Sequence, residues 1–259
     1  MSNIALITGA SNGIGLGLAR EFAKHKTDVV LVARNEAKLK EIAQELTSTY
    51  GVKAIVMAKD LSKQDNADEL FREVKQAGLE IGYLINNAGF GDFGMFSESD
   101  WKKQQEMITV NIITLTRLCR LFIPEMIQRK QGRILNLAST AAFQPGPLMA
   151  VYYATKAYVL LFSEAINNEL KGSGITVTAL CPGPTTSGFE EASNLKESKL
   201  FKKKKLPDAA EVAKYGYSVM MKGKSVAIHG WMNRAMVLSG RFAPRDMVTA
   251  IVRKMSEKQ

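Results

Sequence analysis

Two side chains with complementary acid–base chemistry, Tyr152 and Lys156, stand four residues apart. Residues at this spacing share one face of a helix. A tyrosine hydroxyl has a reference pKa of about 10 and exchanges protons slowly at neutral pH. An ammonium about 4 Å away would favour the phenolate by roughly 4 kcal/mol at an effective dielectric constant near 20, and burial would oppose this. The pair predicts a tyrosine of lowered pKa that acts as a general acid or base.

Two further polar residues precede this pair. Ser139 follows an expected strand, and its hydroxyl can hydrogen-bond a carbonyl oxygen. Asn111 lies in an expected long helix, where its amide could hold a water molecule for a proton relay. Each residue alone is weak evidence, because a Tyr–Lys pair at helical spacing more often lies on a solvent-exposed surface without a catalytic role. Their combined order and spacing point to proton transfer on a carbonyl or alcohol.

A glycine-rich turn follows the first expected strand and opens the first expected helix. Glycine lets the backbone turn tightly beside a pyrophosphate, and the helix start offers unpaired amides to phosphate oxygens. The spacing is Gly-x-x-x-Gly-x-Gly rather than the common Gly-x-Gly-x-x-Gly. A plain strand–helix turn is the alternative, but the position after an N-terminal strand favours a dinucleotide. The candidate cofactor contacts here are Gly9, Ser11, Asn12, Gly13, Ile14 and Gly15.

The end of the second expected strand discriminates between nicotinamide cofactors. A carboxylate there would bind the ribose hydroxyls of NAD. Arg34 stands in that place, and a guanidinium suits a phosphate. NADP(H) is therefore favoured over NAD, with a solvent-exposed Arg34 as the alternative. After the third strand, Asp60 and Leu61 are candidate adenine contacts, although Asp60 could equally cap a helix.

A regular alternation of strands and helices must position these residues. Short aliphatic runs predict strands at 4–7, 29–33, 54–57, 83–85, 134–137, 175–180 and 226–228. Longer segments predict helices at 36–50, 63–77, 101–129, 151–171 and 209–222, and two short ones after Gly230. Strands that are aliphatic on both faces, separated by helices, predict an α/β fold with a doubly wound parallel sheet in one domain, 1–259. Ligands of such sheets bind at the carboxyl ends of the strands.

Composition narrows the class of protein. The chain has 259 residues, of which 46% are hydrophobic and 23% charged, which excludes a disordered chain. Two cysteines are too few for a disulfide framework and lack metal-ligand spacing, so no metal is expected. No targeting segment or apolar run of about 20 residues is apparent, so we expect a cytoplasmic location. The net charge of +10 admits anionic partners, and the basic run 202–205 is interpreted as a solvated loop.

Together the motifs resemble the short-chain dehydrogenase/reductase (SDR) family in its compact, NADP-preferring form. The resemblance covers nearly the whole chain. It rests on the glycine turn, Asp60, 86–89, Asn111, Ser139, the Tyr152–Lys156 stretch and Pro182-Gly183. It implies a Rossmann-like seven-stranded sheet and a metal-free ternary complex with NADP(H) and a small-molecule carbonyl or alcohol.

The resemblance also implies a role for each matching residue. Tyr152 would be the catalytic acid/base, and Lys156 would lower its pKa and bind the nicotinamide ribose. Ser139 would polarise the substrate carbonyl, and Asn111 would support the water relay. The remaining cofactor contacts would be Gly9, Gly13 and Gly15 at the pyrophosphate, Asn87, Ala88 and Gly89 on the nucleoside side, and Pro182 and Gly183 at the nicotinamide.

The substrate side is less specific in the sequence. The subgroup resembles oxidoreductases of broad carbonyl substrate and relatives that reduce long-chain 3-oxoacyl thioesters. An apolar substrate pocket could be lined by Phe90, Phe93, Phe143, Leu148, Met149 and Phe189, although packing in the core explains such residues equally well. The irregular segment 185–206 is interpreted as a substrate lid.

The leading prediction is an NADPH-dependent carbonyl reductase, reversible as an alcohol dehydrogenase. An NADP-binding sensor without turnover is one alternative, and a basic nucleic-acid-binding protein is another. Epimerases and dehydratases use the same fold and Tyr–Lys pair, in generally longer chains. For the reductase we expect no nucleic-acid or membrane partner. By family analogy we expect a homodimer or homotetramer that associates through helices 101–129 and 151–171.

Overall fold

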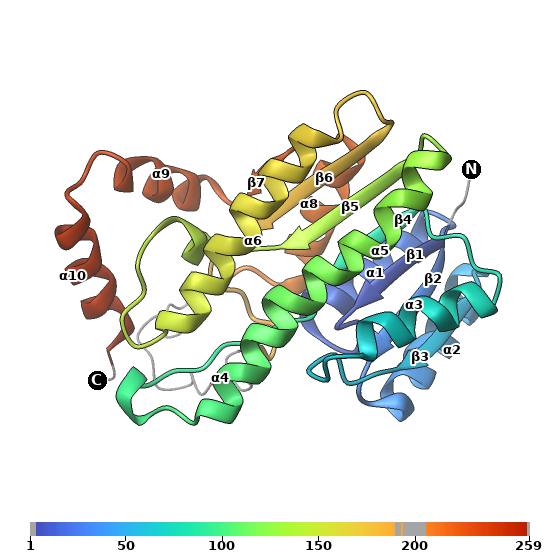
Figure 1. The fold of residues 1–259 in the computed structure, drawn as a ribbon, viewed down its shortest axis with the longest axis horizontal. Coiled ribbons are helices and arrows are strands. Elements are labelled where there is room, and N and C mark those ends of the chain that lie inside the picture. Colours follow the sequence, from blue (N-terminus) through green and yellow to red (C-terminus); the bar gives the residue numbers. More distant parts are fainter. Residues whose placement is uncertain (1–3, 190–192, 194–205, 258–259) are drawn as a thin grey trace.

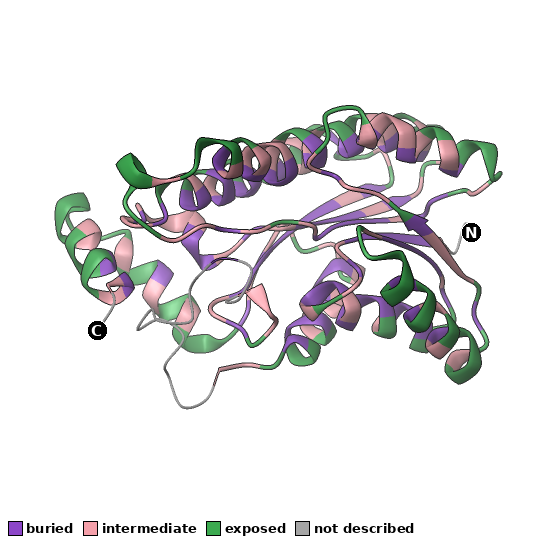
Figure 2. Ribbon diagram, turned by 90° about the horizontal axis from the view of Figure 1, so that it is seen from below, coloured by how far each residue is buried: buried purple, intermediate pink, exposed green. Residues whose placement is uncertain are grey.

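The computed structural model describes residues 4–189, 193 and 206–257. Most of the expected lid, including the basic run 202–205, lies outside the described residues. The described residues form one sheet with helices on both faces, which Figure 2 shows edge-on as two helical layers around the strands.

The sheet contains all seven predicted strands, and every neighbouring pair is parallel. Their order is β3-β2-β1-β4-β5-β6-β7. The bounds are β1 Ile4–Thr8, β2 Asp28–Ala33, β3 Ala54–Ala58, β4 Tyr83–Asn86, β5 Gly132–Leu137, β6 Ile175–Cys181 and β7 Val226–Ile228. The order reverses between β1 and β4, so the doubly wound, single-domain prediction is confirmed. The carboxyl ends of these two strands meet at the switch point.

Helices cover both faces because the strand side chains alternate between two apolar clusters. In β1, Leu6 faces one cluster, whereas Ala5 and Ile7 face the other. Helices α3 (Asn66–Gln76), α5 (Leu115–Gln128) and α6 (Ala150–Glu169) contribute to the first cluster. The second cluster includes α1 (Gly13–Lys24), α2 (Glu36–Tyr50) and α8 (Ala209–Met221). A strand buried on both faces must be aliphatic throughout, and this explains the runs in the sequence.

The helix predicted at 101–129 is interrupted. It consists of α4 (Trp101–Ile108), a π-helical turn (Thr109–Thr114) and α5. A π turn adds one residue to the hydrogen-bonded ring and often marks a functional position. The whole segment Trp101–Gln128 is long and apolar enough to cross a membrane by length and composition alone. Its buried side belongs to the core of this fold, which accounts for that composition.

The two short C-terminal helices predicted after Gly230 are present. They are α9 (Trp231–Gly240) and α10 (Arg245–Ser256), and Figure 1 shows them beyond the end of the sheet, beside α6. Val252 of α10 joins a small apolar cluster with Met107, Met149, Tyr152 and Tyr153. The C-terminal helices are therefore packed against the element that carries the Tyr–Lys pair.

Candidate active site

A cavity of about 490 Å³ lies at the carboxyl ends of the strands. The turns after β1, β4, β5 and β6 contribute to its walls, together with α6 and α9. The predicted residues that line it are Gly9, Asn12, Gly13, Ile14, Asn87, Ala88, Gly89, Ser139, Met149, Tyr152, Lys156, Pro182, Gly183 and Phe189. The cavity thus brings the glycine turn and the Tyr–Lys pair into one site.

The glycine turn needs glycine at two positions for geometric reasons. Gly9 and Gly13 have φ angles of +66° and +54°, in the left-handed region that favours glycine. A Cβ atom at Gly9 would lie 2.7 Å from the Asn87 amide, and one at Gly13 would lie 2.6 Å from the carbonyl oxygen of Ser187. The Asn12 side chain accepts a hydrogen bond from the Gly13 amide at 2.7 Å and caps α1. The first turn of α1 therefore opens onto the cavity.

Asn87 braces this turn from the neighbouring strand. Its side-chain amide donates to the backbone oxygens of Thr8 and Gly9, at 2.9 and 3.2 Å. The Thr8 hydroxyl in return accepts from the backbone amides of Asn87 and Ala88, both at 3.0 Å. These bonds join the ends of β1 and β4 at the switch point, so Asn87 shapes the wall of the cavity as well as lining it.

The Tyr–Lys pair occupies the first two turns of α6. Both side chains are buried, and the Lys156 Nζ lies 5.8 Å from the centroid of the Tyr152 ring. Lys156 donates a hydrogen bond to the backbone oxygen of Leu137 at 2.7 Å, which ties α6 to the end of β5. The Ser139 hydroxyl accepts a hydrogen bond from the Ala141 amide at 3.1 Å and lies close enough to the Tyr152 phenol to influence its pKa. The three predicted side chains therefore converge on one wall of the cavity.

The electrostatics of Tyr152 differ from the prediction. Burial raises the pKa of the Tyr152 phenol above its ordinary value, and the neighbouring Ser139 side chain opposes this only in part. Burial also lowers the pKa of the Lys156 ammonium to about 8, against an opposing interaction with Cys181. The expected lowering of the tyrosine pKa by Lys156 is thus wrong for this arrangement, because desolvation is the larger effect. Tyr152 is held in its protonated, proton-donating form.

Asn111 links the loop after β4 to α6. It lies in the π turn, and its side-chain amide donates to the Phe90 oxygen and to the Thr155 hydroxyl, both at 3.0 Å. Its side-chain oxygen accepts from the Phe90 amide at 3.2 Å. Asn111 is absent from the described cavity wall. These bonds give it a positioning role, and its support of a relay water stays a prediction.

The residues predicted at the adenosine end lie outside this cavity. Arg34 is exposed directly after β2. Burial disfavours ionisation of Asp60, but hydrogen bonds from Ser62 and the charges of Arg34 and Lys63 outweigh it, so the pKa of Asp60 lies below its ordinary value. Asp60 does not cap the next helix, because α3 begins at Asn66.

Leu61 and Gly15 are not part of the wall either. Leu61 is buried in the core, and its backbone oxygen accepts a hydrogen bond from the Thr114 hydroxyl at 2.9 Å. Gly15 is buried in the first turn of α1, and Ser11 lies outside the wall. The glycine turn therefore reaches the cavity mainly through Gly9, Asn12, Gly13 and Ile14.

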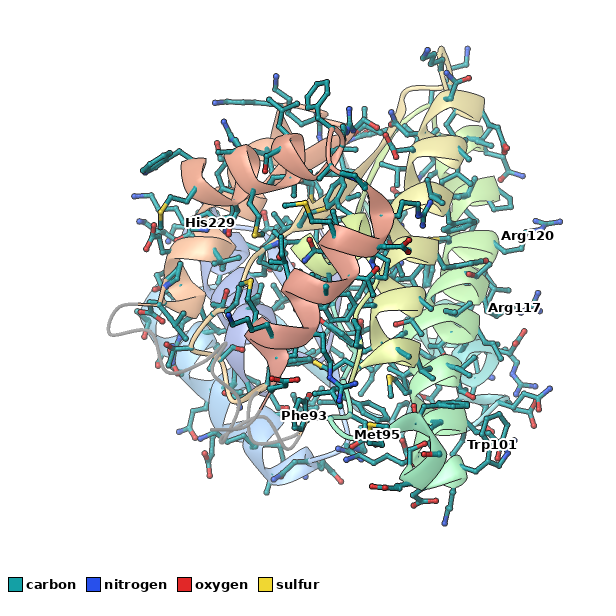
Figure 3. The ribbon with its side chains drawn as sticks, turned by 90° about the vertical axis from the view of Figure 1, so that its left-hand side faces the viewer. Phe93, Met95, Trp101, Arg117, Arg120 and His229 are labelled. Atoms are coloured by element: carbon teal, nitrogen blue, oxygen red, sulfur yellow. The ribbon has the colours of Figure 1, made fainter. Side chains whose placement is uncertain are left out.

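The aromatic substrate residues were predicted only in part. Met149 and Phe189 line the cavity, and the Phe189 ring lies 5.2 Å from the Tyr152 ring. Phe90, Phe93 and Phe143 are absent from the wall of this cavity and pack against apolar clusters, and their contact with a substrate stays a prediction. Figure 3 shows Phe93 below α10. Leu148 is likewise absent from the wall of this cavity.

The sequence analysis missed the contribution of the C-terminal helices. Trp231, Met232 and Met236 of α9 and Met255 of α10 line the cavity. The spacing of the methionines in the C-terminal segment does not indicate that these residues line a cavity. They give the substrate side of the site an apolar wall of flexible side chains, which tolerates ligands of varied shape.

The described part of the expected lid touches the glycine turn. Ser187 lies against Gly13, and Gly188 lies against Asn12. Ser193 is buried, and its hydroxyl accepts a hydrogen bond from the Gly91 amide at 3.0 Å. The segment after β6 is thus in contact with both the cofactor side and the β4 loop, while its function as a lid stays a prediction.

Comparison with known proteins agrees with this geometry. The family model for short chain dehydrogenases matches residues 3–198. The very-long-chain 3-oxoacyl-CoA reductase of Anas platyrhynchos is 36% identical over 182 residues, which are 69% of this chain and 58% of that protein. The 17-beta-hydroxysteroid dehydrogenase type 3 of Mus musculus is 35% identical over 77% of this chain and 65% of its own length. The chain thus spans less than two thirds of these curated relatives.

A solved structure extends the likeness to nearly the whole chain. The short-chain dehydrogenase from Sphingobium yanoikuyae in complex with NADPH superposes with a TM-score of 0.83 and 31% identity. The match covers 92% of this chain and 93% of that one, whereas the family model ends at residue 198.

Proposed function

Because this chain belongs to the short-chain dehydrogenase/reductase family, we propose that it is an NADP(H)-dependent reductase of ketones or aldehydes, reversible as an alcohol dehydrogenase. One observation carries the proposal: the side chains of Ser139, Tyr152 and Lys156 line one cavity together with the glycine turn. A protein that only sensed the cofactor would need the turn but not the other three groups.

The residues of this chain supply position and a proton. NADPH, when bound, supplies the hydride for the carbonyl carbon. In the reduction, Ser139 donates a hydrogen bond to the substrate oxygen, and Tyr152 transfers its proton to that oxygen, so a C–H bond and an O–H bond replace the carbonyl π bond. The raised pKa of Tyr152 keeps this proton in place at neutral pH. Lys156, whose ammonium is fixed by Leu137, stabilises the phenolate left behind.

The preference for NADP(H) over NAD(H) rests on Arg34. It is exposed after β2, close enough to influence Asp60, and no carboxylate stands at its position in the sequence. The glycine turn and the open first turn of α1 fit a pyrophosphate, because backbone amides and the helix dipole both favour an anion there. The NADPH complex of the Sphingobium yanoikuyae relative supports the same cofactor.

For the substrate we propose a bulky, apolar carbonyl compound. Met149, Phe189, Trp231, Met236 and Met255 give the cavity an apolar wall on the side of α9 and α10. The two curated relatives are, by name, a very-long-chain 3-oxoacyl-CoA reductase and a 17-beta-hydroxysteroid dehydrogenase. A very long acyl chain and a steroid skeleton are both large and apolar. A pocket lined by flexible methionines suits such ligands.

The experiment is NADPH consumption across a panel of ketones, aldehydes, quinones and 3-oxoacyl thioesters, with Tyr152→Phe beside the wild type. The wild type should turn over apolar members of the panel. The variant should keep its NADPH affinity and lose turnover by about 10²–10⁴-fold, because only the proton donor is removed. Silence of the wild type across the panel would favour the sensor instead. Turnover retained by Tyr152→Phe would show that another group donates the proton.

A further inference from the structure

The two C-terminal helices have one face that packs against the rest of the protein and one face that is exposed. We call α9, α10 and the residues between them, 231–256, the C-terminal arm. The inward face of the arm packs Val237 and Val252 against the body of the protein and contributes Met236 and Met255 to the cavity. The outward face is exposed in Figure 2, where the arm lies at the end of the molecule away from the N-terminus. Apart from Trp231 and Met232, which also line the cavity, this outward face takes no part in the site described above.

The outward face is apolar to an unusual degree. Trp231, Leu238 and Phe242 follow one another at spacings of seven and four residues, which place them on one side of α9 and its continuation. Trp231 is 79% exposed and Phe242 84% exposed, and on α10 Met247 and Ile251 are also exposed. Large apolar side chains gathered on one surface usually mark an interaction site.

Basic side chains border this apolar surface. Between 231 and 256 the chain carries five basic residues and one carboxylate, a net charge of +4. Arg241, Arg245 and Lys254 are exposed and form no ion pair within the described residues. Arg241 lies seven residues after Arg234, so a basic edge runs beside the apolar stripe. An apolar face with aromatic residues and a basic border is the pattern of helices that lie in a membrane interface.

We propose that the outward face of the C-terminal arm docks on an anionic membrane surface. The apolar stripe would enter the boundary between headgroups and acyl chains, and the basic border would contact the anionic headgroups. Charge favours this occupant over a second arm, because two-fold contact between arms would bring two basic surfaces together. From the sequence we expect no membrane partner, because no purely apolar run of about 20 residues is apparent. Docking of this kind is peripheral and needs no span.

Docking would also orient the cavity. Trp231 and Met232 belong both to the outward surface and to the lining of the cavity, so the membrane-facing side of the arm lies at the cavity edge. An apolar molecule dissolved in the membrane would then reach the site along the arm. The docking itself rests only on the surface of the arm and does not depend on the proposed reductase activity.

The two tryptophans of the chain allow a direct test. Trp101 lies on α4, and Figure 3 shows it well apart from α9 and α10. In Trp101→Phe, the emission of Trp231 should shift to the blue with phosphatidylcholine vesicles that contain about one third phosphatidylglycerol, and brominated acyl chains should quench it. The matched control is Trp231→Phe, in which Trp101 should show neither effect although it is 59% exposed. Equal responses from both tryptophans, or none from Trp231, would overturn the proposal.

Sedimentation with the same vesicles tests the residues of the stripe and its border. Leu238→Ser/Phe242→Ser and Arg241→Gln/Arg245→Gln should each lower the bound fraction about tenfold, and pure phosphatidylcholine should bind the wild type about tenfold more weakly. Leu238 and Phe242 lie outside the cavity wall, so NADPH affinity and the unfolding midpoint should not change. A pair of variants that changes the oligomeric state but leaves vesicle binding intact would overturn the proposal in favour of a second copy.

Discussion

Lys156 brings an ammonium group into the interior of the site, where burial lowers its pKa to about 8 from the ordinary 10.5. This shift has a consequence for stability. Between pH 8 and 10.5 the unfolded chain keeps the proton on this residue, whereas the folded chain has lost it. The free energy of unfolding contributed by Lys156 therefore rises with pH across that window, by at most about 1.4 kcal/mol per pH unit.

The prediction compares wild type with Lys156→Met. Their difference in unfolding free energy, measured by denaturant titration, should shift in favour of the wild type as pH rises from 8 to 9. Burial raises the pKa of Cys119 and Cys181 to about 12, which weakens both proteins above about pH 9. The comparison stops at pH 9 because Lys156 lowers the pKa of Cys181, so the Cys181 effect differs between the two proteins. Lys171→Met, at an exposed position after α6, is the control. A difference that is flat with pH would contradict the burial of the Lys156 charge.

Arg34 leads to a prediction about cofactor choice. In Arg34→Asp a carboxylate would repel the 2′-phosphate of NADPH and accept hydrogen bonds from the ribose hydroxyls of NADH. The loss of one charged hydrogen-bonding group should lower kcat/KM for NADPH by about 10–100-fold. Steady-state kinetics with both cofactors measure this. Arg72→Asp, on the exposed side of α3, controls for net charge. An unchanged ratio of the two kcat/KM values would remove Arg34 from the cofactor site.

At the residue scale, the identity of the reactive side chains was easier to predict from the sequence than the environment of each side chain. Ser139, Tyr152 and Lys156 do converge, because their types and order suffice to identify them. The direction of the Tyr152 pKa was wrong, since burial is a property of the folded chain that a spacing of four residues does not contain. The surroundings of Phe90, Phe93 and Phe143 could not be predicted either, because an aromatic residue fits a core and a cavity wall equally well.

Helix α6 is held in register with the sheet by two contacts. Lys156 bonds the end of β5, and two turns later Ser163 accepts a hydrogen bond from the Asn136 amide of β5 at 2.9 Å. Asn136 in turn accepts from the Asn86 amide of β4 at 2.9 Å. All three of these polar side chains, Asn86, Asn136 and Ser163, are buried. The helix that carries the acid–base pair is thus fixed to two strands through a polar chain inside the core.

The second contact can be removed separately. Ser163→Ala would leave the buried Asn136 amide without its acceptor, which should lower the free energy of unfolding by about 1–3 kcal/mol. Denaturant unfolding measures the loss. Ser239→Ala, at an exposed hydroxyl of α9, should change it by less than about 0.5 kcal/mol. If the two serine variants prove equally stable, the polar chain does not hold α6.

At the element scale, the strands were predictable and the helix irregularities were not. Strands covered on both sides must be aliphatic, so seven runs identified seven strands. The π turn at Thr109–Thr114 has no signature in composition, because it differs from an α-helix only in which carbonyl each amide reaches. The helix expected from Lys63 begins instead at Asn66, since Asp60 engages Ser62 in a local turn first.

On the scale of the whole molecule, the α4–α6 side carries a second exposed apolar surface. Trp101, Ile113, Tyr158 and Leu161 are its large side chains. The Tyr158 hydroxyl lies 3.1 Å from that of Thr116, so α5 and α6 are neighbours there. We propose that this surface forms the interface of a homo-oligomer. It bears neither the net charge nor the cavity contacts of the C-terminal arm.

A leucine-to-arginine substitution on each surface distinguishes their roles in oligomer formation. Leu161→Arg should lower the molar mass measured by sedimentation velocity to that of a monomer, because a buried, unpaired charge is costly at an interface. Leu238→Arg, on the C-terminal arm, should leave the molar mass unchanged. If Leu161→Arg sediments like the wild type, the α4–α6 side is not the interface.

The brace between Asn87 and the glycine turn also bears on how the site is made during synthesis. The two partners are 79 residues apart in the chain, whereas Lys156 and Leu137 are separated by only 19. Translation proceeds from the N-terminus, so the glycine turn leaves the ribosome before β4 does. Its hydrogen bonds with Asn87 can form only after β4 has also emerged. In the acid–base pair, by contrast, Lys156 bonds to Leu137, which is close to it in the sequence. The glycine turn is therefore synthesised early but reaches its final conformation only after Asn87 has been synthesised. A chain arrested before Asn87 lacks the groups that hold the turn in shape.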